Sequence, residues 1–123
     1  MDPQHQQQTG LTAAHRLATY GTLAPGRPNQ HQLAELDGRW LQGQVNGTLT
    51  DAGWAARLGY PALTLDPHGP AVNVHLFESA DLPAHWTRLD RFEGPGYQRV
   101  TTTVHTTTGD VSASIYVLRV HPT

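Results

Sequence analysis

The sequence of 123 residues predicts an α+β fold with a single core. Short apolar or alternating segments, separated by Gly, Pro, Asp and Asn, recur from Trp40 onward and are typical of strands. One amphipathic helix interrupts them after residue 80. Two segments rich in β-branched residues, joined by a turn at Thr107–Asp110, predict a hairpin near the C-terminus. One strand before a first helix and several antiparallel strands with a second helix inserted favour α+β.

The elements follow in order along the chain. Residues 1–14 are glutamine-rich and show no periodicity, so we expect a flexible tail there and a single domain over residues 15–123. The segment Leu17–Tyr20 is predicted as a first strand, and Asn29–Leu36 as a short helix after a Pro- and Gly-rich loop. The further predicted strands are Val45–Leu49, Pro61–Leu65, Val72–Phe77, Tyr97–Thr106 and Val111–Leu118.

The second helix has clear signals at both ends. Ser79–Asp81 offer capping side chains and an early negative charge, and Pro83 suits a first helical turn. Apolar residues recur at i, i+4 and i+7 from Leu82 to Leu89, which is the spacing of one helical face. Gly94 then ends the helix.

Glu93 stands out on this helix. On a wheel of about 100° per residue it lies roughly 20° from Leu82, in the middle of the apolar stripe. Burial and the negative end of the helix dipole both disfavour its charged form and raise its pKa towards neutrality, where a carboxylate can exchange protons. The alternative is that the helix end frays and Glu93 reaches solvent or an arginine. Asp90, at the edge of the stripe, is expected to make structural hydrogen bonds.

A second feature is the segment Tyr20-Gly21-Thr22-Leu23. A strand that ends in Tyr-Gly can turn sharply and direct consecutive backbone N–H groups at one point, which binds a carboxylate or phosphate without a basic side chain. A strand followed by a glycine turn is also ordinary architecture. The segment alone therefore leaves both interpretations open.

Composition argues against several other functions. The net charge is −2, and the positive residues are eight scattered arginines with no lysine, so we expect no nucleic-acid partner. Cysteine is absent, which excludes disulfides and thiolate zinc sites. No apolar run is long enough for a signal peptide or a membrane span, so the expected location is cytoplasmic, with no membrane partner.

The remaining chemistries also lack their motifs. The eight histidines show no close ligand pairing, so no metal is expected, and no Gly-rich nucleotide loop indicates a cofactor. None of the serines lies in the Gly-x-Ser-x-Gly turn of a hydrolase.

Taken together and in order, several blocks resemble the γ-glutamylcyclotransferase-like family, in its AIG2-like branch. The similarity extends over roughly residues 16–118. Its blocks are Tyr20-Gly21-Thr22-Leu23, Gly59-Tyr60-Pro61-Ala62-Leu63, Leu89-Asp90-Arg91-Phe92-Glu93-Gly94 with Tyr97-Gln98-Arg99, and Ile115-Tyr116-Val117.

The resemblance implies a fold and a function. The fold is a small mixed, largely antiparallel β-barrel with flanking short helices. The implied activity converts a γ-glutamyl amine or γ-glutamyl amino acid to 5-oxoproline and a free amine without a cofactor. Glu93 is implied as the catalytic residue, and Tyr20, Gly21, Thr22 and Leu23 as the residues that bind the γ-glutamyl group. A monomer or homodimer is expected.

Two points stay open at this stage. A non-catalytic relative that binds a small γ-glutamyl-like or carboxylate ligand is the alternative, because a fold does not guarantee its chemistry. The strand Val72–Phe77 also departs from the family pattern, since Val74 replaces a glycine and His75 an acid. This departure affects the expected shape of the substrate pocket and not the catalytic glutamate.

Overall fold

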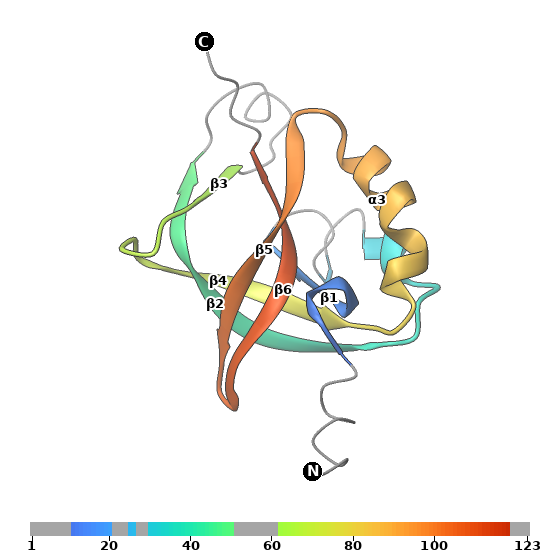
Figure 1. Ribbon diagram of the computed structural model, residues 1–123, viewed down its shortest axis with the longest axis horizontal. Helices are drawn as coiled ribbons and strands as arrows, with labels where there is room; N and C mark the ends of the chain where they lie inside the picture. Colours follow the sequence, from blue (N-terminus) through green and yellow to red (C-terminus); the bar gives the residue numbers. More distant parts are fainter. Residues whose placement is uncertain (1–10, 21–24, 27–29, 51–61, 119–123) are drawn as a thin grey trace.

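The computed structural model describes residues 11–20, 25–26, 30–50 and 62–118 (Figure 1). The predicted cradle residues Gly21, Thr22 and Leu23 lie outside these ranges, as does Tyr60. The strands are β1 (Arg16–Thr19), β2 (Arg39–Thr50), β3 (Ala62–Leu65), β4 (Ala71–Glu78), β5 (Tyr97–Thr106) and β6 (Gly109–Leu118). The helical segments are η1 (Ala13–His15), η2 (Gln30–Leu33), η3 (Leu82–His85) and α3 (Trp86–Glu93).

The strands form a mixed barrel. They are ordered β3-β2-β4-β1-β6-β5, and a further pairing between β2 and β5 closes the sheet. β1 and β6 are parallel, whereas the other pairs are antiparallel. Figure 1 shows the strands curving around a common interior, with α3 beside them. The barrel with flanking short helices is therefore confirmed.

The barrel closes at one point of the long strand β2. Residues 39–46 of β2 pair with β4, residues 47–50 pair with β3, and Gln44 is opposite His105 of β5. Gly43 allows this approach, because a Cβ atom there would lie 2.5 Å from Val104 Cγ1 and 3.1 Å from the His105 carbonyl oxygen. A glycine where another strand approaches closely is a usual feature of barrels.

Alternating side chains of the strands build two apolar clusters. One fills the barrel and contains Ala18, Val74 and Ile115. The other lies between the outer face of the barrel and the helical segments, and it contains Leu17 and Leu89. Neighbouring residues of β1 thus point to opposite faces of the sheet, as the two-residue period of a strand requires.

The predicted second helix is confirmed, but its start differs from the expectation. It begins as the 3₁₀ segment η3 with Pro83 in its first turn and becomes α-helical at Trp86. Asp81 makes no capping hydrogen bond with its side chain. Its carboxylate instead accepts a hydrogen bond from the Asp37 main-chain N–H, which connects the helix to the chain before β2.

The first helical segment, η1, crosses the predicted boundary between the tail, residues 1–14, and the domain. Thr12 caps η1 through its hydroxyl, and the η1 carbonyls accept two side-chain hydrogen bonds. Trp86 Nε1 donates to the Ala14 carbonyl at 2.9 Å, and the Ser114 hydroxyl donates to the Ala13 carbonyl at 2.8 Å. Long-range partners of this kind leave no periodicity in the local sequence. No helix in the described part of the chain is long and apolar enough to cross a membrane.

Candidate active site

Glu93 is the last residue of α3, at the point where the chain turns into β5. Gly94 ends the helix with a φ of 89°, and its N–H donates to the Asp90 carbonyl at 3.1 Å. That backbone angle lies in the left-handed region, which favours glycine. Glu93 lies four residues after Leu89, and therefore on the same face of α3. Leu89 is fully buried. The glutamate thus lies at the edge of the cluster under α3.

The Glu93 carboxyl is half-buried, and burial raises its pKa from 4.5 to about 7. Among the residues that the structure describes, no arginine or histidine lies within ion-pair distance of it. Desolvation without a compensating cation disfavours the ionised form. A carboxyl with a pKa near 7 exchanges protons readily at neutral pH, which suits an acid/base role.

Two tyrosines lie close enough to Glu93 for its charge to affect their pKa values: Tyr20, which directly follows β1, and Tyr116 of β6. Burial is the largest cause that raises the pKa of Tyr20, followed by Tyr97 and then Glu93. Burial is also the largest cause that raises the pKa of Tyr116, followed by Asp90. The charge of Glu93 raises the Tyr116 pKa further. The Tyr20 hydroxyl donates to the Tyr116 main-chain carbonyl at 2.7 Å. Glu93 therefore lies beside phenol groups from the ends of β1 and β6.

Asp90 contrasts with Glu93 on the same helix. Hydrogen bonds from Arg99 are the main reason that its pKa lies below the usual range, and burial opposes this effect. The Arg99 Nε atom lies 2.9 Å from Asp90 Oδ1, and the Tyr116 hydroxyl donates to the same oxygen at 2.6 Å. Two carboxyl groups on one helix thus have pKa values moved in opposite directions. Such a separation identifies Glu93 as the acid/base candidate and Asp90 as a fixed anion.

The structure assigns places to the other residues that the sequence singled out. Tyr20 directly follows β1 and packs against the cluster inside the barrel. Val74 points into the barrel with 2% of its surface exposed, whereas His75 packs edge-on against Trp40 at 6.5 Å between ring centroids. Of the two residues that depart from the family pattern, Val74 therefore narrows the barrel interior and His75 does not.

Two features near the site carry no signal in the sequence pattern. Thr19, directly before Tyr20, is 5% exposed, and its hydroxyl has no hydrogen-bond partner among the described residues. Arg99 stacks over the Trp86 ring at 4.2 Å from its centroid while it binds Asp90. Neither feature follows from local spacing, because the burial of Thr19 and the contacts of Arg99 both depend on how different elements pack together.

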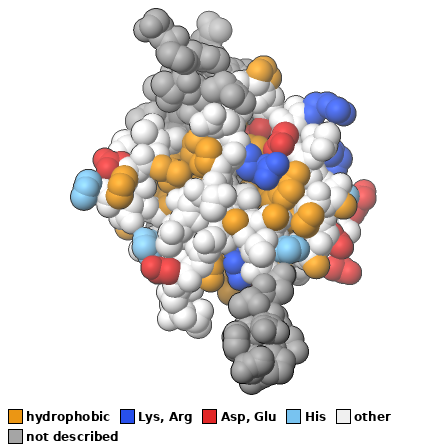
Figure 2. All heavy atoms as spheres, in the orientation of Figure 1, with side chains coloured by type: hydrophobic (Ala, Val, Ile, Leu, Met, Phe, Trp, Pro, Cys, Tyr) orange, Lys and Arg blue, Asp and Glu red, His pale blue; other side chains and the backbone are white. Residues whose placement is uncertain are grey.

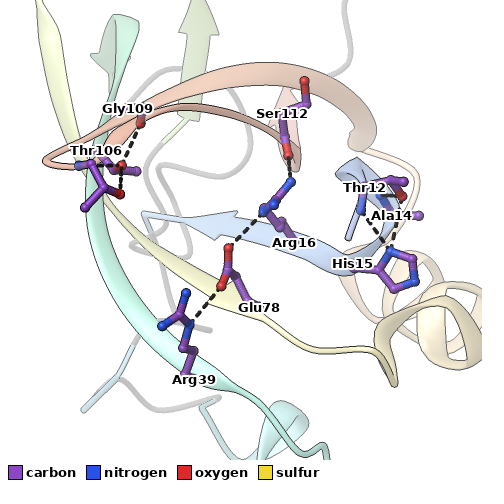
Figure 3. A network of polar contacts seen from close by, with 10 residues as sticks. Thr12, Ala14, His15, Arg16, Arg39, Glu78, Thr106, Gly109 and Ser112 are labelled. Carbon is purple, nitrogen blue, oxygen red and sulfur yellow. Dashed lines mark hydrogen bonds and ion pairs between the residues drawn. The ribbon is translucent and has the colours of Figure 1, made fainter. Parts of the chain in front are cut away.

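A second buried carboxylate lies away from Glu93. Glu78 accepts hydrogen bonds from Arg16 and Arg39, each at 2.9 Å (Figure 3). Burial alone would raise its pKa, but the two arginines outweigh burial and hold the pKa below the usual range. The group borders a depression of about 330 Å³ that Leu11 and Gly38 also line. A carboxylate paired with two cations is poorly suited to proton transfer. We therefore read this cluster as structural: it connects Arg16 of β1 and Arg39 of β2 to Glu78 of β4.

The face drawn in Figure 2 shows no continuous band of one charge over the described residues. Its arginine, acidic and histidine side chains are interspersed with apolar and uncharged groups. Within the described ranges, no three histidine or acidic side chains gather in a group that could hold a metal ion.

Comparison with known proteins identifies related folds. Residues 17–123 match the family described as gamma-glutamyl cyclotransferase, AIG2-like. The solved structure of YkqA from Bacillus subtilis is 28% identical with a TM-score of 0.67, and the match covers 85% of this chain. The chain corresponds to 36% of the length of YkqA. No curated protein sequence gives a significant match.

Two further solved structures show the same fold at lower identity. An AIG2-like protein from Mus musculus is 22% identical with a TM-score of 0.67, and the match covers 88% of this chain and 79% of that one. An uncharacterized protein from Pyrococcus horikoshii is 20% identical with a TM-score of 0.59, and the match covers 88% and 80% of the two chains. At these identities the two structures support the fold alone.

Proposed function

Because the chain belongs to the AIG2-like family of γ-glutamyl cyclotransferases, we propose that it is a cyclotransferase that forms 5-oxoproline in the cytoplasm. Its substrate is a γ-glutamyl amine or γ-glutamyl amino acid, and the second product is the free amine. The observation that carries this proposal is the half-buried Glu93, which has a pKa of about 7 and no cation paired with it in the described ranges.

The proposed reaction is an intramolecular aminolysis. Glu93 accepts a proton from the α-ammonium group of the substrate. The freed amine then attacks the γ-carbonyl carbon of the same γ-glutamyl group. The new C–N bond closes the five-membered ring, the bond to the leaving nitrogen breaks, and Glu93 returns the proton to that nitrogen. The ring nitrogen loses its second proton to the released amine or to water, which leaves the neutral lactam and the protonated amine. Since the nucleophile is tethered to its target, the enzyme has mainly to hold a reactive conformer and transfer protons.

The other residues of the site have binding roles in this proposal. Backbone N–H groups at Gly21, Thr22 and Leu23 hold the substrate α-carboxylate, and Tyr20 forms one wall of the site. The half-buried position of Tyr20 and its raised pKa support the wall role, since a neutral phenol excludes water without adding charge. Neither step of the reaction needs a metal or a cofactor.

The leaving amine is expected to vary. Specificity is expected to depend on the mouth of the barrel and on interior residues such as Val74, which lies in the cluster inside the barrel. We propose that the γ-glutamyl group is held deeply and that the leaving amine projects towards solvent. Small γ-glutamyl amines and dipeptides are then preferred over glutathione.

A panel experiment separates this proposal from a non-catalytic binding protein. Purified protein is incubated with γ-glutamyl amines, γ-glutamyl amino acids and glutathione, and 5-oxoproline is measured by mass spectrometry. Binding of the same compounds is measured in parallel by calorimetry. Release of 5-oxoproline from the small compounds supports the enzyme. Binding across the panel with no product would identify a binding protein.

A further inference from the structure

Asp90 lies one helical turn before Glu93 and is bonded to two strands of the barrel. Arg99 of β5 donates from Nε to Oδ1 at 2.9 Å and from Nη2 to Oδ2 at 3.2 Å. Tyr116 of β6 donates from its hydroxyl to Oδ1 at 2.6 Å. The Asp90 main-chain carbonyl also accepts the N–H of Gly94. One residue thus anchors the last turn of α3 from both its side chain and its backbone.

The helix needs such an anchor because it is short. α3 has eight residues, and His85 at its start makes no capping hydrogen bond with its side chain. Isolated helices of this length are marginal in water, and their ends fray. Arg99 contacts α3 twice, since it stacks over the Trp86 ring at the first residue and binds Asp90 near the last. These contacts oppose fraying at the end that carries Glu93.

The same contacts lie around the tyrosines beside Glu93. After burial, which is the largest cause, Asp90, Arg99 of β5 and Glu93 all affect the pKa of Tyr116, and Tyr97 of β5 and Glu93 affect that of Tyr20, which directly follows β1. These charged and phenol groups therefore share one region of the site. The guanidinium of Arg99 is bidentate to Asp90, so its positive charge is directed at that carboxylate. A bidentate pair of this kind has a defined geometry, which a single point contact lacks.

We propose that Asp90 is a positioning residue that, together with Arg99 and Tyr116, fixes the last turn of α3 and keeps the Arg99 charge away from Glu93. The importance of this placement for turnover rests on the proposed function. The effect on the Glu93 charge does not, because it can be measured in a protein that turns nothing over.

The charge effect is tested by NMR titration of the Glu93 carboxyl in protein carrying ¹³C-labelled glutamate, with Glu93→Gln used to assign its signal. Asp90→Asn removes a negative charge and releases the Arg99 guanidinium, so the Glu93 pKa should fall by roughly one unit. Arg99→Ala leaves the Asp90 charge without its partner, so the Glu93 pKa should rise. Arg99→Lys should stay close to the wild type, as should Arg91→Lys, which changes an exposed arginine of the same helix.

Opposite shifts in the two variants are not expected of a residue that only stabilises the fold. An unchanged Glu93 pKa in folded Asp90→Asn and Arg99→Ala would overturn the proposal. If Asp90→Asn does not fold, Arg99→Ala decides the same question, because it alters the same charge pair from β5.

The positioning effect is tested with Tyr116→Phe, which removes one hydroxyl and no charge. With a γ-glutamyl substrate that the wild type converts, we expect kcat to fall about tenfold or more while KM changes little, since misplacement of a catalytic group costs rate. An unchanged kcat would overturn this part. A wild-type protein that converts no substrate would contradict the proposed function, and the NMR shifts would still decide the role of Asp90.

Discussion

Replacement of Glu93 by glutamine should make the protein more stable at pH 8. Burial raises the pKa of the folded-state carboxyl from 4.5 to about 7, so the folded chain holds this proton to a higher pH than the unfolded chain. The stabilising contribution is complete below pH 4.5 and is lost as the pH rises through about 7. Glutamine has nearly the same shape and no charge, and it avoids this loss.

The size of the effect follows from the shift in pKa. Each unit corresponds to about 1.4 kcal/mol, so the ionised Glu93 costs the folded state about 3 kcal/mol at pH 8. We expect Glu93→Gln to exceed the wild type in free energy of unfolding by about this amount at pH 8. The difference should shrink to about 1 kcal/mol at pH 5 and vanish near pH 3.5, where the carboxyl is protonated in both the folded and the unfolded chain.

Urea denaturation at a series of pH values measures this difference directly. Comparison of wild type and variant at each pH removes the contributions of the other titrating groups. Glu35→Gln is the matched control, because it removes an exposed glutamate and should give no comparable gain at pH 8. A variant that is equally stable or less stable than the wild type at pH 8 would refute the reasoning from burial.

Three further substitutions test other parts of the structure. Gly43→Ala should lower the free energy of unfolding by about 1 to 3 kcal/mol in urea denaturation, because its Cβ would meet Val104 where β2 pairs with β5. An unchanged value would show that the two strands can move apart to accommodate the methyl group. Thr19→Val should raise it by about 1 kcal/mol, because it removes a buried hydroxyl with no described partner; a loss instead would indicate a hydrogen bond there. Val74→Gly should accept a wider range of γ-glutamyl substrates in a 5-oxoproline assay, at a cost of about 2 kcal/mol or more in stability, because it opens space inside the barrel; an unchanged range would separate Val74 from the pocket.

The strands and the helix with Glu93 could be predicted because their signals are local. The alternation in β5 and β6 and the apolar stripe from Leu82 to Leu89 are periodic patterns that each element needs in order to bury one face. The end of the helix at Gly94 follows from the backbone angle that glycine tolerates. β2 proved longer than the predicted Val45–Leu49, because it pairs with three different strands along its length.

The contacts that position the site could not be read from the sequence in this way. Asp90 was expected to make structural hydrogen bonds, but its partners Arg99 and Tyr116 come from two other strands. The hydrogen bond from Trp86 that holds η1 likewise joins residues far apart in the chain. Local periodicity carries no information about such pairings, which depend on the order of the strands in the barrel.

The most direct test of the account is the rate of 5-oxoproline release as a function of pH, measured for the wild type and Glu93→Gln with a small γ-glutamyl amine. Because Glu93 must be ionised to accept a proton, the wild-type rate should rise with pH through about 7. In Glu93→Gln we expect the rate to be reduced at least about 100-fold and to show no rise with pH. The variant should still unfold cooperatively, which shows that it is folded. A folded Glu93→Gln variant with a rate near that of the wild type would contradict the assignment of Glu93 as the proton-transfer residue.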